Sequence, residues 1–153
     1  MRLSSSIIQS LAFISFKNWN SFSSFSSDLT FLSNWSFKTL YSSLINLRFP
    51  EIYRNLSKKK LHFISVPSAF TKVTGKKHWL DLLKARAIEN FCYIFAPNQT
   101  GKNTEKRETF GHSTIISPDG KIIKLKKFGT GIIYANIDPS QSMKLRKIIP
   151  SLN

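Results

Sequence analysis

The segment 46–90 decides the fold, and it begins Asn46-Leu-Arg-Phe-Pro-Glu-Ile-Tyr-Arg54. It continues through Pro67-Ser-Ala-Phe-Thr71 and ends with Gly75-Lys-Lys-His-Trp-Leu-Asp-Leu-Leu-Lys-Ala-Arg-Ala-Ile-Glu-Asn90. Pro50 suits the first turn of a helix, where its missing N–H leaves no hydrogen bond unmade. Helix signals therefore alternate with short apolar runs, which is typical of a mixed α/β domain.

The rest of the chain continues this alternation. Trp79, Leu83 and Ala87 lie at helical spacing and predict one inner helix face. Ser117-Pro118-Asp119-Gly120 has the residues of a type I turn between two strands, and Asp138 followed by Pro139 predicts a helix start. In order we expect a helix at 51–58, a strand at 61–66, a loop at 71–75, a helix at 78–90, a strand at 91–96, a polar loop at 98–109, paired strands at 112–117 and 121–125, a strand at 131–137 and a helix at 138–147.

Composition bounds the partners and the compartment. The chain has 153 residues, enough for one ordinary domain, and a formal net charge of +15. Such a charge is compatible with nucleic acid or an anionic membrane as a partner. The alternative is a lysine-rich surface without a specific partner. The lysine clusters are scattered, and no aromatic-platform motif accompanies them in sequence, which favours that alternative. Cys92 is the single cysteine, so no internal disulfide can form.

Residues 1–43 differ from residues 44–153. They hold 14 serines and six phenylalanines, but no glycine, proline or glutamate. Their apolar residues follow neither a helical nor a strand period, so we predict an irregular segment with a boundary near Ser43. A frame-shifted remnant and a targeting segment both remain open as explanations. No apolar run is long enough for a spanning helix.

The motifs from 44 onward resemble the nitrilase superfamily of carbon-nitrogen hydrolases, in the branch of omega-amidases and deaminated glutathione amidases. The resemblance rests on these motifs, in family order: Arg48-Phe49-Pro50-Glu51, Pro67-Ser68-Ala69-Phe70-Thr71, Gly75 with His78-Trp79, Arg86-Ala87-Ile88-Glu89-Asn90 and Gly111-His112-Ser113. It implies the C-terminal half of an αββα sandwich that pairs with a second copy. It also implies hydrolysis of amide C–N bonds through a cysteine thioester, without metal or cofactor.

The catalytic residues of that family are not recognisable here. Leu44 occupies the position of the family's nucleophilic cysteine, so no catalytic residue is assigned. The family's glutamate and lysine precede the cysteine, but the first glutamate is Glu51, and Lys17 and Lys38 have no matching context. Cys92 lies in an apolar run, where cysteine is usually a buried small hydrophobe. The candidate residues for lining a substrate pocket are Arg48, Phe70, Thr71 and His78. For His78 the alternative is that it caps and packs at the junction of loop and helix.

Two further groups have mainly structural interpretations. Arg86 and Glu89 are three residues apart on one helix face and are expected to form a surface pair of little energetic value. The family resemblance implies an alternative, in which this helix lies at a subunit contact. His112 follows Gly111 at a strand start, where we favour packing over chemistry because a lone histidine is a poor indicator of a site.

We therefore predict a cytoplasmic carbon-nitrogen hydrolase family protein that by descent acts on a small carboxylate-bearing amide and is itself inactive. The expected partners are that small amide, if the chain is active, and a second copy of the chain. No membrane partner and no specific nucleic acid are expected. The alternatives are a basic nucleic-acid-binding module and a non-catalytic interaction protein.

Overall fold

The computed structural model describes residues 9–15, 39–41, 46–104 and 107–151. It is a mixed α/β structure, as predicted. No helix in these ranges is long and apolar enough to cross a membrane. Its elements in chain order are β1 (Gln9–Ser15), β2 (Thr39–Tyr41), the 3-10 helix η3 (Asn46–Arg48), α1 (Pro50–Ser57), β3 (Phe63–Ser65), α2 (Lys72–Asn90), β4 (Tyr93–Ala96), β5 (Thr100–Thr104), β6 (Arg107–Phe110), β7 (Ser113–Ile116), β8 (Ile122–Lys126), β9 (Gly131–Ile137) and α3 (Ser140–Ile148).

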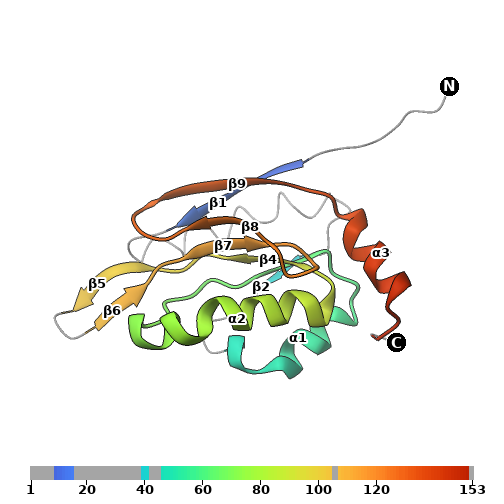
Figure 1. Cartoon of the computed structure of the whole chain (residues 1–153), viewed down its shortest axis with the longest axis horizontal. Coiled ribbons are helices and arrows are strands. Elements are labelled where there is room, and N and C mark those ends of the chain that lie inside the picture. The colour runs from blue at the N-terminus through green and yellow to red at the C-terminus, as the bar shows by residue number, and fades with distance from the viewer. Residues whose placement is uncertain (1–8, 16–38, 42–45, 105–106, 152–153) are drawn as a thin grey trace.

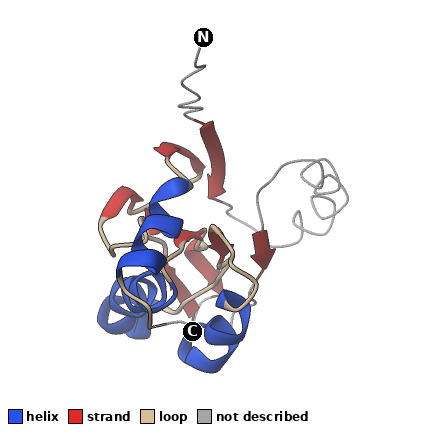
Figure 2. Cartoon of the chain, turned by 90° about the vertical axis from the view of Figure 1, so that its right-hand side faces the viewer, coloured by secondary structure: helices blue, strands red, loops and turns tan. Residues whose placement is uncertain are grey.

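Two stacked sheets form the middle of the molecule (Figure 1). In the larger sheet, with strand order β2-β3-β4-β7-β8, the first three strands are parallel and the other two pair antiparallel. In the smaller sheet β9 pairs antiparallel with β1. Figures 1 and 2 show α1 and α2 on one side of the larger sheet and β9 with β1 on the other. The described layers thus follow the order helix, sheet, sheet of an αββα sandwich.

Strands β3, β4 and β7 of the larger sheet are buried along their whole length, and their successive residues point to opposite faces. Ile64 and Ile94 face the helices, in a core cluster that also contains Trp79 and Leu83 of α2. The alternate positions face β9 in a second cluster made by Phe63, Tyr93, Phe95, Ile115, Ala135 and Ile137. Burial on both sides explains why these strands are continuous apolar runs in the sequence.

Helix α2 begins six residues before the predicted start, so the predicted loop at 71–75 is wrong. Thr71 caps the helix, because its side chain accepts a hydrogen bond from the Thr74 N–H at 3.4 Å. Gly75 indicated a turn in the sequence, but it lies inside the helix. A Cβ at this position would overlap the side chain of Phe110, so glycine permits close packing of α2 against β6.

The predicted polar loop at 98–109 is also wrong, since β5 and β6 form a two-stranded ribbon there. The ribbon is anchored to the body of the domain near its base. Phe110 N–H donates a hydrogen bond to the Phe70 carbonyl at 2.8 Å, and Gln99 N–H donates to the Ser68 carbonyl at 2.9 Å. Polar side chains hid this ribbon from the sequence analysis because neither strand has an apolar face of its own.

The later elements match the prediction closely. The Gly120 N–H donates to the Ser117 carbonyl at 2.9 Å, which closes the predicted turn between β7 and β8. β9 has the predicted bounds. Helix α3 begins at Ser140, two residues later than predicted, although the Asp138 carboxylate still accepts a hydrogen bond from the Ser140 N–H at 2.9 Å. A shift of one or two residues is ordinary at helix ends.

Two strands lie within the segment 1–43, for which no element was predicted. β1 pairs along β9 from Gln9 opposite Ile137 to Ser15 opposite Gly131. β2 adds a parallel strand to the larger sheet, with Thr39 opposite Phe63. The irregular pattern of this segment therefore concealed two strands, while the domain boundary near Ser43 stays a prediction.

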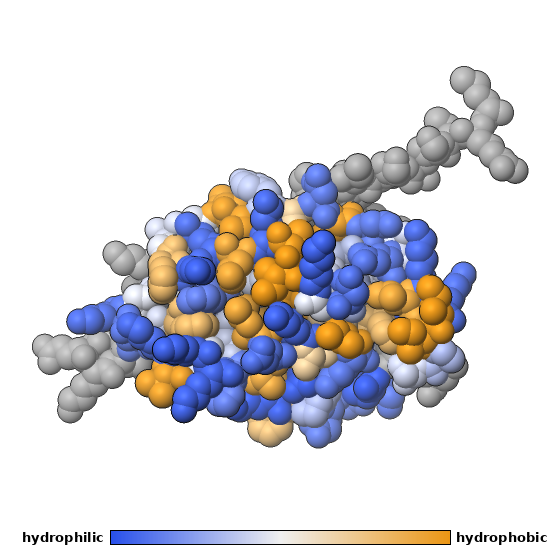
Figure 3. Space-filling model, viewed as in Figure 1, coloured by the Kyte–Doolittle hydropathy of each residue, from blue (hydrophilic) through white to orange (hydrophobic). Residues whose placement is uncertain are grey.

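The described surface carries several exposed apolar side chains. Ile132 and Tyr134 project from the outer side of β9, where their side chains are 46% and 56% exposed. Phe128, in the turn between β8 and β9, is 67% exposed. Figure 3 shows hydrophobic residues reaching the surface in patches among hydrophilic ones on the drawn face.

Candidate functional site

Arg48, Phe70 and Thr71 come together where η3 meets the start of α2. The guanidinium carbon of the exposed Arg48 lies 5.6 Å from the centre of the Phe70 ring, within the range of a cation–π contact. Phe70 is buried, and its ring packs on Trp79 with centroids 5.0 Å apart. A rigid ring thus supports a charged group that remains accessible to solvent.

Asn98 fixes the backbone at Phe70 through side-chain hydrogen bonds. This residue was not among the predicted site residues. Its side-chain oxygen accepts the Phe70 N–H at 2.9 Å, and its Nδ2 donates to the Gly111 carbonyl at 2.6 Å. The side chain is 1% exposed. Its position directly after Pro97, beyond the carboxyl end of a buried parallel strand, is the signal that could have identified it.

His78 does not join the other three residues predicted to line a pocket. It lies on the exposed side of α2, one position from the buried Trp79. None of the described contacts links it to Arg48 or Phe70. Whether any of the four residues contacts a substrate stays a prediction.

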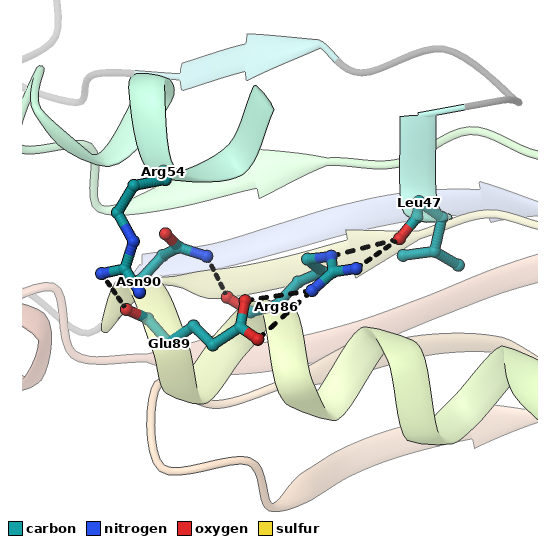
Figure 4. A network of polar contacts seen from close by, with 5 residues as sticks. All are labelled: Leu47, Arg54, Arg86, Glu89 and Asn90. Atoms are coloured by element: carbon teal, nitrogen blue, oxygen red, sulfur yellow. Dashed lines mark hydrogen bonds and ion pairs between the residues drawn. The ribbon is translucent and has the colours of Figure 1, made fainter. Parts of the chain in front are cut away.

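Arg86 and Glu89 form the predicted pair, with Nη1 3.0 Å from the Glu89 carboxylate, but the expected surface position is wrong for Arg86. Arg86 is only 4% exposed. Its Nε and Nη2 donate to the Leu47 carbonyl at 3.1 and 2.9 Å (Figure 4), and its guanidinium lies 5.3 Å from the centre of the Tyr53 ring. The buried guanidinium thereby fixes η3, the turn that carries Arg48.

Glu89 and Asn90 complete this network at the end of α2. Arg54 of α1 donates a hydrogen bond to the Glu89 carbonyl at 3.0 Å, and Asn90 Nδ2 donates to the Arg86 carbonyl at 2.8 Å (Figure 4). Polar contacts thus join α1 to the C-terminal end of α2, while Arg86 alone links α2 to the turn that precedes α1. Among the residues described, no group of three histidine, cysteine or acidic side chains is placed to hold a metal ion.

The comparisons with known proteins match this framework. A sequence model described as carbon-nitrogen hydrolase covers residues 45–147. The chain belongs to the carbon-nitrogen hydrolase family.

Named relatives agree with this family. The chain is 48% identical over 107 residues to the deaminated glutathione amidase of Synechocystis sp. (strain PCC 6803 / GT-S), covering 70% of this chain and 39% of that protein. It is 39% identical over 105 residues to the human deaminated glutathione amidase, covering 69% of this chain and 32% of the relative. The chain therefore spans well under half the length of these relatives.

Solved structures confirm the nitrilase-superfamily fold. The Caenorhabditis elegans NitFhit protein matches with a TM-score of 0.71 and 39% identity, over 74% of this chain and 27% of that chain. Saccharomyces cerevisiae Nit3, a member of branch 10 of the nitrilase superfamily, matches with a TM-score of 0.67 and 32% identity, over 72% of this chain and 41% of that chain.

Cys92 is a buried structural residue in this carbon-nitrogen hydrolase domain, as the sequence predicted. It is 0% exposed and lies in the core cluster beside α2. Burial raises the pKa of its thiol to about 12, although the positive charge of Arg146 partly opposes this shift. A nucleophilic cysteine needs the thiolate and access to a substrate, and Cys92 has neither at neutral pH.

Leu44, which the family resemblance aligned with a nucleophilic cysteine, lies outside the described residues. Leu44 immediately precedes the family match and the described turn at η3. Lys17 and Lys38, the lysines before it, also lie outside the described residues. The absence of a cysteine at 44 is nevertheless a fact of the sequence.

Proposed function

We propose that this carbon-nitrogen hydrolase domain binds a small carboxylate-bearing amide but does not hydrolyse it. The observation that carries the proposal is the contrast between Leu44 and Arg48, four residues apart. Leucine has no atom that could attack a carbonyl, whereas Arg48 keeps an exposed guanidinium on an ordered support.

The lost step is nucleophilic attack. Thioester chemistry needs a thiolate next to a general base, and the only cysteine has a pKa raised by burial to about 12. A glutamate before the nucleophile position is also lacking, because residues 1–50 contain none. These features support a domain without hydrolytic turnover.

The retained step is recognition of a carboxylate. An arginine guanidinium presents paired N–H donors that match both oxygens of a carboxylate. None of the ion pairs in the described part of the chain includes Arg48. Its guanidinium therefore has no carboxylate partner among the described residues. The names of the relatives identify amidases of deaminated glutathione, which supports a small amide as the ligand class.

Titration with glutaramate, the monoamide of glutaric acid, tests this proposal. We expect saturable binding by calorimetry, weakened roughly 10- to 150-fold by Arg48→Ala because a charge-assisted hydrogen bond contributes about 1.5–3 kcal/mol. Arg54→Ala is the matched control, since it removes another exposed arginine from the neighbouring helix. Equal effects of the two substitutions, or no binding by the unmodified chain, would reject the proposal.

A further inference from the structure

Three aromatic rings meet where β6 leads into β7 and β8 leads into β9. Phe110 and His112 lie parallel, with centroids 3.8 Å apart and an interplanar angle of 5°. Phe128 meets His112 edge-on with centroids 5.4 Å apart. Phe128 is 67% exposed, so the stack ends in a ring that solvent can reach.

The backbone holds the middle ring firmly. His112 has a φ of 60°, a left-handed conformation that non-glycine residues seldom adopt. Its N–H donates to the Lys127 carbonyl at 2.9 Å, and its carbonyl accepts the Trp79 Nε1–H at 2.8 Å. The His112 ring, on which Phe128 rests, is therefore held in place before any ligand arrives, which lowers the entropy lost on binding.

Positive charge lies next to the exposed end of the stack, because Lys126 and Lys127 directly precede Phe128 in the chain. The segment 120–137 contains four lysines and no acidic residue. Lys127, next to Phe128, is exposed. Glu108, two residues before Phe110, is already paired with Lys72 at 2.9 Å, so its negative charge is largely compensated.

The turn after Phe128 leaves room for a flat ligand. Gly129 has a φ of 78°, and no atom lies within 4 Å of the place where its Cβ would be. A planar group stacked on Phe128 would therefore meet no bulky side chain at the next residue. A negatively charged group attached to that planar group would lie beside Lys127.

We propose that the surface formed by Phe128, His112 and Lys127 binds single-stranded nucleic acid without sequence preference. Unpaired bases stack on aromatic side chains, and lysines neutralise the adjacent phosphates. A duplex keeps its bases stacked inside, so it could use the lysines but not Phe128. This extends the sequence analysis, which expected no specific nucleic acid, because folding creates an aromatic platform from residues 16 to 18 positions apart.

Fluorescence anisotropy with a labelled oligothymidylate of about ten nucleotides tests the site, because that length suits common single-strand binding surfaces. We expect the full chain to bind it more tightly than a duplex of equal length. Phe128→Ala should weaken single-strand binding roughly 5- to 150-fold, the range for loss of one base–aromatic stack. Phe128→Tyr should retain binding, and duplex affinity should not change in either variant.

Matched variants separate this site from the general charge. Replacement of Lys126 and Lys127 by glutamine should lower the salt dependence of binding by about one phosphate contact, while the same replacement at Lys58 and Lys59 should not. Phe49→Ala removes another exposed phenylalanine and should have no effect. Equal affinity for duplex, or equal loss in the Phe49 and Phe128 variants, overturns the proposal. Phe128-dependent binding to anionic lipid vesicles without oligonucleotide binding also overturns it.

Discussion

The guanidinium of Arg86 is tied to the backbone carbonyl of Leu47 by two hydrogen bonds, from Nε at 3.1 Å and from Nη2 at 2.9 Å. These residues are 39 positions apart, and the contact joins the last turns of α2 to the turn before α1. Arg86 thereby supports the backbone next to Arg48, the residue that we propose binds a carboxylate.

Arg86→Met should loosen the turn at η3, because the Leu47 carbonyl would lose both donors inside the protein. An unsatisfied buried group costs roughly 1–3 kcal/mol, so amide hydrogen exchange across residues 46–57 should accelerate roughly 5- to 150-fold by that estimate. Arg54→Met removes a single exposed hydrogen bond to the Glu89 carbonyl and is the control. Unchanged exchange in the Arg86 variant would show that the contact does not hold this turn.

Local chemistry explains which elements could be predicted from the sequence. Pro50, the Ser117–Gly120 turn and the strand Gly131–Ile137 carry signals within a few residues, and the structure confirms them. The start of α2 was missed because Gly75 indicated a turn, whereas its conformation is set by packing against Phe110.

The candidate site was harder to predict because its geometry depends on distant contacts. The burial of Arg86 follows from the Leu47 carbonyl, and the role of Asn98 follows from the Phe70 N–H. In the sequence, Leu47 lies far from Arg86 and Phe70 lies far from Asn98, so no local spacing pattern relates the two partners of either contact. The grouping of Arg48 with Phe70 could be anticipated only through the family resemblance.

Gly75→Ala should destabilise the domain even though alanine is the better helix former by about 1 kcal/mol. The added Cβ would overlap Phe110, and overpacking of this kind typically costs about 1–3 kcal/mol. Lys76→Ala, on the exposed side of the same helix turn, should be nearly neutral. Hydrogen exchange of α2 compares the two, and a Gly75 variant as protected as the unmodified chain would contradict the close packing.

Cys92 should resist thiol reagents in the folded protein at pH 8. Burial raises its pKa from 9.0 to about 12, so folding favours the neutral thiol. This contribution to stability is complete below about pH 9 and is lost as the pH rises through 9.0 toward 12. Labelling by a disulfide reagent should proceed only as fast as unfolding, with the urea-unfolded chain as the reactive control. Rapid labelling of the folded chain would refute the buried position.

The outer side of β9 should make the isolated chain prone to aggregation. Ile132 and Tyr134 are exposed there, and no helix in the described residues covers them. Apolar surface that stays in contact with water lacks the stabilisation of about 25 cal/mol per Å² that burial would give. Replacing both residues by threonine should reduce light scattering at a given concentration, whereas Val73→Thr, at an exposed apolar residue on α2, should not. A soluble unmodified monomer with cooperative unfolding would contradict this expectation.

Release of ammonia from glutaramate by the purified chain tests the central claim most directly, because the proposal separates binding from hydrolysis. With Leu44 in place of a nucleophile and Cys92 buried, we predict no release above the rate without protein, even at concentrations that saturate binding. Leu44→Cys alone should not restore turnover, since no glutamate precedes that position in the chain. Ammonia release by the unmodified chain that disappears in Cys92→Ala would contradict the account.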